Sequence, residues 1–360
     1  MLMRLAAIIL FLTGLLGFFA CRKPASVPPE RREWLCMGTI AAVQCVDHTQ
    51  TEEVVNLTEP IFAGIEKELS AWQTNSCLNI LNHSAGNGRS IPVSPSVFRV
   101  LQVAVEASEA SGGAFNPLLG PLLHAWGFNG ATTPLTPPDE VLLKALRPLT
   151  DWHAITCRVL PDGKTATVSL LRAGMSLDLG AIAKGFAVDQ AWQCLLQAGY
   201  TNLLVDLGGN LRAIGEASPG RGGWRTAIRS PFDRTTIIGS FLMHHGEAVA
   251  TSGNYERFVE INGIRHAHIL DGRSGYPVHG MASVTVIAPD AMTADLLSTT
   301  LFILGPHQGL SLLHRYPGCD ALWIPDTPDN PHLLSSPGFA KRIATSIAPP
   351  FYLVPPHSNP

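Results

Sequence analysis

Asp295 and Thr299 lie four residues apart in residues 293–304, a stretch whose pattern predicts a helix that Gly305 ends. Side chains at this spacing face the same way, one turn apart. A carboxylate and a hydroxyl oxygen suit a hard cation such as Mg²⁺, which takes few protein ligands and leaves room for water and substrate phosphates. An acidic residue in a first helical turn also complements the helix dipole, so the pair alone leaves a structural role open.

A second set of polar groups lies in residues 178–185, Asp178-Leu-Gly-Ala-Ile-Ala-Lys184-Gly. The pattern predicts a short strand over residues 175–180, then a helix that Gly199 ends. A strand that runs through glycine into a helix leaves backbone N–H groups free to meet an anion. Lys184 can add a charge to a phosphate there, and Asp178 can bind a polar ligand group. The segment is neither a P-loop nor a dinucleotide-binding turn, so a structural junction remains the alternative.

A histidine, a carboxylate and an arginine fall within six positions in His268-Ile-Leu-Asp271-Gly-Arg273. Such a group could supply a base, its orienting partner and a phosphate clamp. His266 is an alternative base on the same strand face. A polar turn with a structural ion pair explains the same residues without chemistry. Trp72 and Trp126 could stack on an aromatic ligand or simply belong to the core.

Composition limits the classes of protein to which the chain can belong. It has 360 residues, of which 46% are hydrophobic and 15% charged, so most of it can bury a core. The net charge is −3 and no run of Lys or Arg suggests a nucleic-acid-binding face, so a phosphate-bearing ligand must be held locally. The seven cysteines form no Cys-x-x-Cys pair or Cys/His cluster that would indicate zinc or redox chemistry.

The pattern of elements predicts an α+β fold with a mixed β-sheet core covered by helices. Helices are expected over residues 58–69 and 97–110, and a ligand cleft between the 178–185 junction and the C-terminal helix. Strands are expected over residues 34–46, 165–171 and 202–207, and most of residues 224–288 is predicted as strands and turns.

The N-terminus carries a targeting pattern. A positive start precedes the apolar residues 5–20, a run too short to span a membrane, and Ala20-Cys21 resembles a bacterial lipoprotein cleavage site. Ordinary signal cleavage and an uncleaved anchor are the alternatives. The predicted divisions are a signal at 1–21, a tether at 22–33, one folded domain at 34–343 and a Pro-rich surface tail at 344–360. The protein is expected to be exported and anchored through Cys21 on the periplasmic side of a bacterial membrane.

Taken in order, residues 35–305 resemble the FAD:protein FMN transferase family, the ApbE-type flavin transferases once called thiamine-biosynthesis lipoproteins. The matching segments are Met37-Gly-Thr39, Leu69-Ser-Ala-Trp72 with Leu81-Asn82, Ser111-Gly-Gly-Ala114-Phe115-Asn116-Pro117 leading to Trp126-Gly-Phe, Asp178-Leu-Gly-Ala181-Ile-Ala-Lys184-Gly185, Gly208-Gly209-Asn210, Thr251-Ser-Gly-Asn-Tyr-Glu-Arg257, His268-Ile-Leu-Asp271 and Ala294-Asp295 with Thr299. Ordered blocks of this kind are more specific than any one of them.

The resemblance implies a role for each matching position. The FAD site would be lined by Met37, Trp72, Ala114, Phe115, Asn116, Asp178, Lys184, Ile269 and Leu270. The Ala181 carbonyl, Asp295 and Thr299 would hold Mg²⁺ against the diphosphate, with Ser298 as a further oxygen. His268, supported by Asp271, would activate the acceptor.

In this family a Thr or Ser hydroxyl of a partner flavoprotein attacks the FMN phosphorus of FAD, and AMP leaves. The expected acceptor is a respiratory-type flavoprotein subunit. An FAD pyrophosphatase and a flavin-binding lipoprotein without chemistry are the alternatives. Two positions depart from the family pattern: Asn116 stands where Asp is usual, and Gly272 where Pro is usual.

Overall fold

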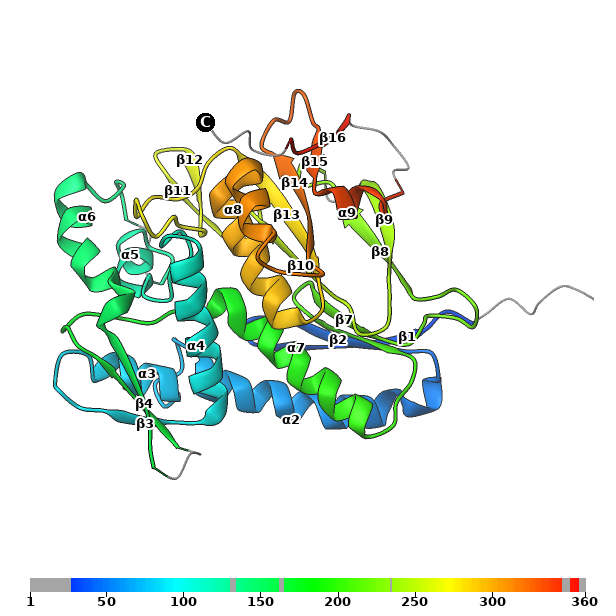
Figure 1. Ribbon diagram of the computed structural model, residues 1–360, viewed down its shortest axis with the longest axis horizontal. Helices are drawn as coiled ribbons and strands as arrows, with labels where there is room; N and C mark the ends of the chain where they lie inside the picture. The colour runs from blue at the N-terminus through cyan, green and yellow to red at the C-terminus, as the bar shows by residue number, and fades with distance from the viewer. Residues whose placement is uncertain (1–26, 130–133, 162–164, 234, 345–349, 356–360) are drawn as a thin grey trace, which may run out of the picture.

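The computed structural model describes residues 27–129, 134–161, 165–233, 235–344 and 350–355 (Figure 1). Its centre is a nine-stranded mixed sheet within these residues, in the order β1-β2-β6-β7-β10-β13-β14-β15-β16. The strands are β1 Glu30–Cys36, β2 Thr39–Cys45, β6 Leu203–Leu207, β7 Asn210–Ile214, β10 Ala248–Gly253, β13 Met281–Ala288, β14 Asp320–Pro325, β15 Leu333–Ser335 and β16 Phe351–Leu353. Neighbouring strands are antiparallel except β15 and β16.

Both faces of this sheet carry apolar side chains. Successive residues of a strand point to opposite faces, so one strand contributes to both cores. In β6, Val205 belongs to the core on one face and Leu204 to the core on the other. The first face packs under helices α2 (Thr51–Leu69), α4 (Pro95–Ala110), α7 (Gly180–Gln197) and α8 (Ala291–Leu313). The second face is covered by the hairpin of β8 (Trp224–Arg229) and β9 (Ile237–Met243) and by α9 (Pro337–Ala340). The predicted α+β class is confirmed.

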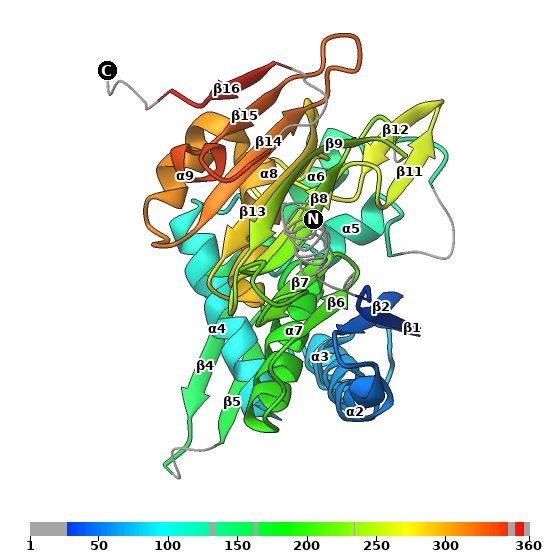
Figure 2. The same cartoon turned by 90° about the vertical axis from the view of Figure 1, so that its right-hand side faces the viewer.

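Smaller elements surround this centre. Strands β3 (Ile91–Val93), β4 (Ile155–Val159) and β5 (Ala166–Leu170) form a second sheet that extends beside α4 (Figure 2). A third apolar cluster, which includes Leu122, Trp126 and Leu270, joins α5 (Gly120–Ala125) and α6 (Glu140–Leu146) to the hairpin of β11 (Phe258–Ile261) and β12 (Ile264–Ala267). The remaining elements are α3 (Cys77–His83) and the 3₁₀ turns η1 (His48–Gln50), η2 (Arg147–Thr150) and η3 (Trp152–Ala154).

The predicted helices are present and longer than their patterns suggested. Helix α2 starts at Thr51, seven residues before the predicted start at Thr58. Proline is favoured in the first turn of a helix, which is where the prediction placed Pro60, but Pro60 lies in the interior of α2. In α8 the backbone of Gly305 leaves the helical region, with φ 70° and ψ 179°, and the chain then resumes a helix to Leu313. Gly305 therefore marks a kink rather than an end.

Three predicted segments differ from the structure. Residues 34–46 form a hairpin rather than one strand, with Met37 at φ 50° in its turn. Because β1 begins at Glu30, the predicted 22–33 tether is wrong over its last four residues. In the predicted surface tail, β16 pairs with β15 and Val354 is buried.

The predicted signal and Cys21 lie outside the described residues. Of the part that is described, α8 has the length and hydropathy of a membrane span, but 61% of its apolar window is buried inside the protein, as expected of a core helix. The six cysteines of the described part are free thiols.

Candidate active site

The start of α7 crosses α8 at close range. A Cβ placed on Gly185 would lie 2.1 Å from the Ala291 carbonyl oxygen, so only glycine allows this approach. Across the crossing, Asp295 Oδ2 accepts a hydrogen bond from the Gly185 N–H at 2.9 Å, and Asp295 Oδ1 lies 3.5 Å from Lys184 Nζ. The 178–185 junction and the 295–299 turn therefore face each other, as the metal hypothesis requires.

Oxygen atoms surround this crossing. The Ala181 carbonyl belongs to the first turn of α7, one turn before Gly185. One turn along α8, the Thr299 hydroxyl lies 3.1 Å from the Ser252 hydroxyl, which is also 2.8 Å from Ser298 Oγ. The buried Asp295 carboxylate thus faces the start of α7, and Thr299 lies one turn further along α8.

This donor set fits Mg²⁺. It offers one carboxylate, a hydroxyl and a backbone carbonyl, all hard oxygen ligands, and Mg²⁺ is usually bound by one or two carboxylates plus substrate phosphates. The described residues contain no group of three or more His, Cys, Asp and Glu side chains that could hold a metal, so this part of the chain offers no zinc-type site.

The segment before α7 has no regular secondary structure and joins no sheet, so the predicted strand over residues 175–180 is wrong. Its backbone is held by a side chain: Asn82 Oδ1 accepts from Leu177 N at 2.7 Å, and Asn82 Nδ2 donates to Leu177 O at 3.0 Å. Asp178 N donates to Pro117 O at 2.8 Å, and the Asp178 carboxylate accepts from Gly180 N at 2.9 Å. These bonds fix the entry to α7 next to the 111–118 loop.

His268 lies just after β12 with a defined tautomer. Its Nδ1 is 3.0 Å from the Arg257 carbonyl oxygen, which can only accept, so Nδ1 carries the proton and Nε2 keeps its lone pair. Burial, the largest cause, and the charges of Arg257 and Lys184 together lower the pKa of His268 to about 4, although the hydrogen bond to the Arg257 carbonyl raises it. The imidazole is therefore neutral at neutral pH and near Lys184.

Asp271 does not orient His268 as the sequence suggested. Its carboxylate pairs with Arg273, with Nη2–Oδ2 at 2.7 Å, and also accepts the Arg273 N–H at 2.9 Å. The Arg257 carbonyl takes the orienting position instead. His266, the alternative base, is buried against Trp126, and Trp126 donates to the Gly275 carbonyl as part of the core.

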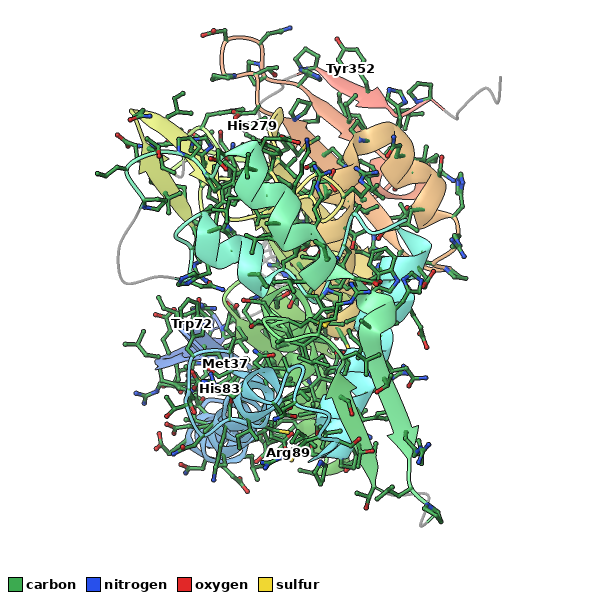
Figure 3. All side chains as sticks on the ribbon, turned by 90° about the vertical axis from the view of Figure 1, so that its left-hand side faces the viewer. Met37, Trp72, His83, Arg89, His279 and Tyr352 are labelled. Atoms are coloured by element: carbon green, nitrogen blue, oxygen red, sulfur yellow. The ribbon has the colours of Figure 1, made fainter. Side chains whose placement is uncertain are left out.

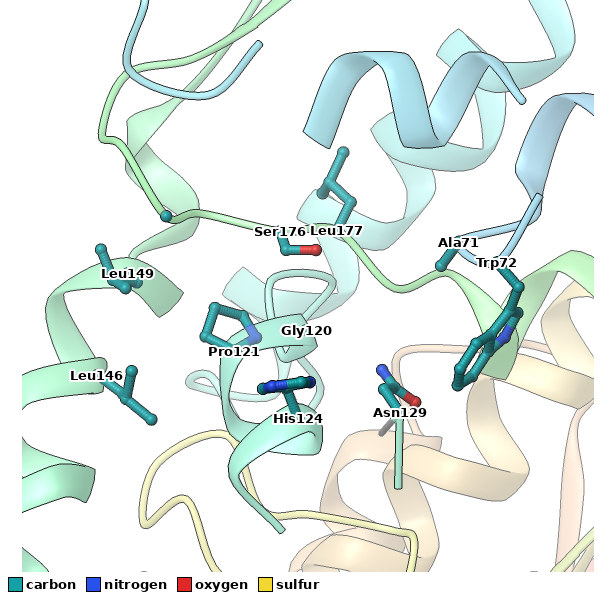
Figure 4. Close-up of a pocket in the computed structure, with 11 residues that line it drawn as sticks. Ala71, Trp72, Gly120, Pro121, His124, Asn129, Leu146, Leu149, Ser176 and Leu177 are labelled. Atoms are coloured by element: carbon teal, nitrogen blue, oxygen red, sulfur yellow. The ribbon is translucent and has the colours of Figure 1, made fainter. Parts of the chain in front are cut away.

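A cavity of about 410 Å³ opens beside the 175–179 segment (Figure 4). Trp72, which is 54% exposed, stands at one side of it and Ser176 and Leu177 at another. The Arg257 guanidinium lies 5.9 Å from the centre of the Trp72 ring, so one residue contacts both His268 and this aromatic wall. Met37, labelled in Figure 3, lies in the turn between β1 and β2 and packs, partly buried, against the helix-covered core.

The other residues predicted to line the flavin site are buried. Asn116 Nδ2 donates to Thr150 O and its Oδ1 accepts from Leu118 N, both at 2.8 Å. Gly272 N donates to Ala114 O, and a Cβ there would lie 2.4 Å from Gly113 O. Ala114, Phe115, Asn116, Ile269 and Leu270 are each at most 5% exposed, so their side chains support the site rather than present a surface.

Comparisons with known proteins agree with this geometry. Residues 37–323 match the sequence model of the ApbE family. The chain belongs to the ApbE family.

Its ApbE relatives include the FAD:protein FMN transferase of Treponema pallidum (strain Nichols), 36% identical over 343 residues, which cover 91% of this chain and 92% of the relative. One from Klebsiella pneumoniae (strain 342) is 38% identical over 276 residues, 76% of this chain and 81% of the relative. The flavin transferase ApbE of Vibrio cholerae superposes with a TM-score of 0.75 at 26% identity, covering 88% and 100% of the two chains. The ApbE protein of Thermotoga maritima gives 0.77 at 27% identity, covering 87% and 98%.

Within this ApbE fold the structure brings together Asp178, Ala181, Lys184, Asp295 and Thr299 on the α7–α8 crossing, with His268 close by. Sequence reasoning missed two residues. Both belong to the matching 251–257 segment, for which no individual roles were predicted. The Ser252 hydroxyl links Ser298 and Thr299. The Arg257 carbonyl holds His268. In the sequence, the feature that could have pointed to these two residues is the polar segment 251–257, which directly follows an apolar strand.

Proposed function

We propose that this protein is a flavin transferase that moves FMN from FAD to a Thr or Ser hydroxyl of a partner flavoprotein, using Mg²⁺ and releasing AMP. The observation that carries the proposal is the approach of the 178–185 junction to Asp295 and Thr299, since it gathers oxygen ligands and a lysine around one point. The names of the relatives support flavin transfer as the activity.

In the proposed reaction the acceptor oxygen forms a bond to the FMN phosphorus, and the bond from that phosphorus to the AMP oxygen breaks. The hydroxyl proton passes to His268 Nε2, whose lone pair is free because Nδ1–H is held by Arg257. Asp178 and the first backbone N–H groups of α7 would position polar groups of the dinucleotide.

Charge on the diphosphate is the main electrostatic cost of this step. Ala181, Asp295 and Thr299 would hold Mg²⁺, which when bound would offset charge on the phosphate oxygens. Lys184 would add a second positive charge. Its Nζ now binds the Gly180 carbonyl at 2.9 Å and lies 3.5 Å from Asp295, within the same small region.

The test is to incubate the protein with FAD, MgCl₂ and a co-purified respiratory-type flavoprotein subunit, and to measure the acceptor by mass spectrometry. We expect the mass of the acceptor to rise by an FMN phosphoester and AMP to appear in equal amount. Free FMN with an unmodified acceptor would show hydrolysis instead. Intact bound FAD with excess Mg²⁺ would show a binding protein without chemistry.

We also propose that the protein is an exported lipoprotein anchored through Cys21, because an apolar run follows a positive start and ends in Ala-Cys. Replacing this cysteine in Cys21→Ala should move the protein from the membrane fraction to the soluble exported fraction. Retention of Cys21→Ala in membranes at the level of the unmodified protein would contradict the lipid anchor.

A further inference from the structure

Helices α7 and α8 lie against each other (Figure 1). Two carboxylates hold this crossing, and each binds the backbone of the other helix. Asp295 of α8 accepts from Gly185 N of α7 at 2.9 Å. One turn further along α7, Asp189 accepts from Ala291 N at 2.7 Å and from Met292 N at 2.9 Å, both in α8. Since Gly185 and Asp189 are four apart, as are Ala291 and Asp295, the contacts form two successive rungs between the helices. We call this arrangement the reciprocal clamp.

Asp189 has a different role from an ordinary helix cap. The first N–H groups of α8 lack intrahelical acceptors and carry the positive end of its dipole, so a carboxylate binds them well. Asp290 caps the same end, because its Oδ1 accepts from Thr293 N at 2.8 Å and its Oδ2 binds the Thr293 hydroxyl at 2.9 Å. The hydrogen bonds of Asp290 stay within α8, whereas those of Asp189 join α8 to α7.

Arg212 of β7 ties the clamp to the sheet. Its Nη1 lies 2.7 Å from Asp189 Oδ1, and the two side chains are each 13% exposed. The same guanidinium donates to Gly246 O at 3.2 Å and to Pro289 O at 3.1 Å, and lies 3.8 Å from the centre of the Trp192 ring. Burial raises the pKa of Asp189 to about 6, so the ionised carboxylate depends on this arginine.

The clamp bears on the metal site because the proposed ligands come from both helices: Ala181 lies on α7, and Asp295 and Thr299 lie on α8. Mg²⁺ demands near-ideal octahedral geometry with short bonds, so a small shift of one helix against the other removes a ligand. We propose that Asp189, held by Arg212, is a positioning residue that sets the separation of α7 and α8 and thereby the affinity for Mg²⁺. This inference rests on the function proposed above.

The test is calorimetric titration of MgCl₂ into the full protein saturated with ADP, whose diphosphate stands in for that of FAD. Asp189→Asn keeps the size of the side chain but lacks a second acceptor, so we expect the Mg²⁺ dissociation constant to rise about tenfold. Asp290→Ala is the matched control: it removes a cap from the same helix end and should lower Tm while leaving the Mg²⁺ dissociation constant within about twofold. Arg212→Lys, which keeps the charge but loses the forked contacts, should give an intermediate rise.

These variants separate the two proposals. Absence of Mg²⁺ binding by the unmodified protein with ADP would contradict the proposed metal site itself. Binding by the unmodified protein with equal affinity in Asp189→Asn or Arg212→Lys would overturn the positioning role and leave the metal site standing. If Asp189→Asn does not fold, Arg212→Lys decides, and a wild-type dissociation constant in that variant would overturn the inference.

Discussion

His268 combines a fixed tautomer with a strongly lowered pKa. Nδ1–H is bound to the Arg257 carbonyl, and burial with two neighbouring cations disfavours the imidazolium. The neutral form, which can accept a proton, therefore dominates at every pH above about 4. A base with such a low pKa binds a proton weakly, but it is in the unprotonated, active form over a wide pH range.

A pH profile follows from this pKa. The active form of the base is lost as pH falls through its folded pKa, so kcat/KM for transfer should stay level from pH 8 to below 6 and decline only toward about 4. The measurement is the initial rate of acceptor labelling across this range at saturating MgCl₂, so that protonation of Asp189 near pH 6 does not limit metal binding. His268→Ala should bind FAD normally and lose roughly 10²–10⁴ in rate. A decline centred near pH 6.5, or normal transfer by His268→Ala, would contradict the assignment.

Asn116 is fitted to its position as an amide. Its Nδ2 donates to the Thr150 carbonyl, a contact that a carboxylate cannot make. Asn116→Asp, which restores the residue usual in the family, should therefore lower the free energy of unfolding by about 1–3 kcal/mol at pH 7. The measurement is urea denaturation. The control is Asn87→Asp, since the exposed Asn87 side chain accepts from Arg89 N through Oδ1, a bond that a carboxylate can keep. Equal stability of the two variants would count against this explanation.

At the scale of elements, the contact between α7 and α8 depends on a missing side chain. Gly185→Ala would place its Cβ 2.1 Å from the Ala291 carbonyl oxygen, so the helices must separate. We expect the free energy of unfolding to fall by about 1–3 kcal/mol. We also expect the affinity for Mg²⁺ to fall, because the proposed ligands come from both helices. Gly64→Ala is the control, because that exposed glycine of α2 has nothing within 4 Å of a Cβ and should gain about 0.5–1 kcal/mol. Thermal or urea unfolding of both variants measures this. A neutral Gly185→Ala would mean that the crossing is looser than the structure shows.

The elements that could be predicted are those with a local signal. Helical spacing located α7, and Gly199 marked its end, whereas Gly305, predicted to end α8, only kinks it. The 175–179 segment was assigned to a strand because its apolar alternation is the same as that of a strand. The backbone of this segment instead binds the side chain of Asn82, 95 positions away. A contact between such distant residues cannot be predicted from the local pattern of apolar and polar residues.

For the whole molecule, apolar patterning predicted the α+β class but not the order of the strands. The ordered polar blocks predicted which residues meet, and Lys184 does lie beside Asp295. Side-chain partners were beyond the sequence. The sequence predicted Asp271 as the partner of His268, but Asp271 pairs with Arg273 and the Arg257 carbonyl orients His268.

The most direct measurement is anomalous diffraction from crystals of the protein grown with FAD and MnCl₂, since Mn²⁺ accepts the same oxygen ligands as Mg²⁺. We expect one strong peak bonded to the Ala181 carbonyl, Asp295 and Thr299, in contact with the diphosphate oxygens. A peak elsewhere with FAD bound, or FAD bound with its diphosphate away from Asp295, would contradict the proposed site.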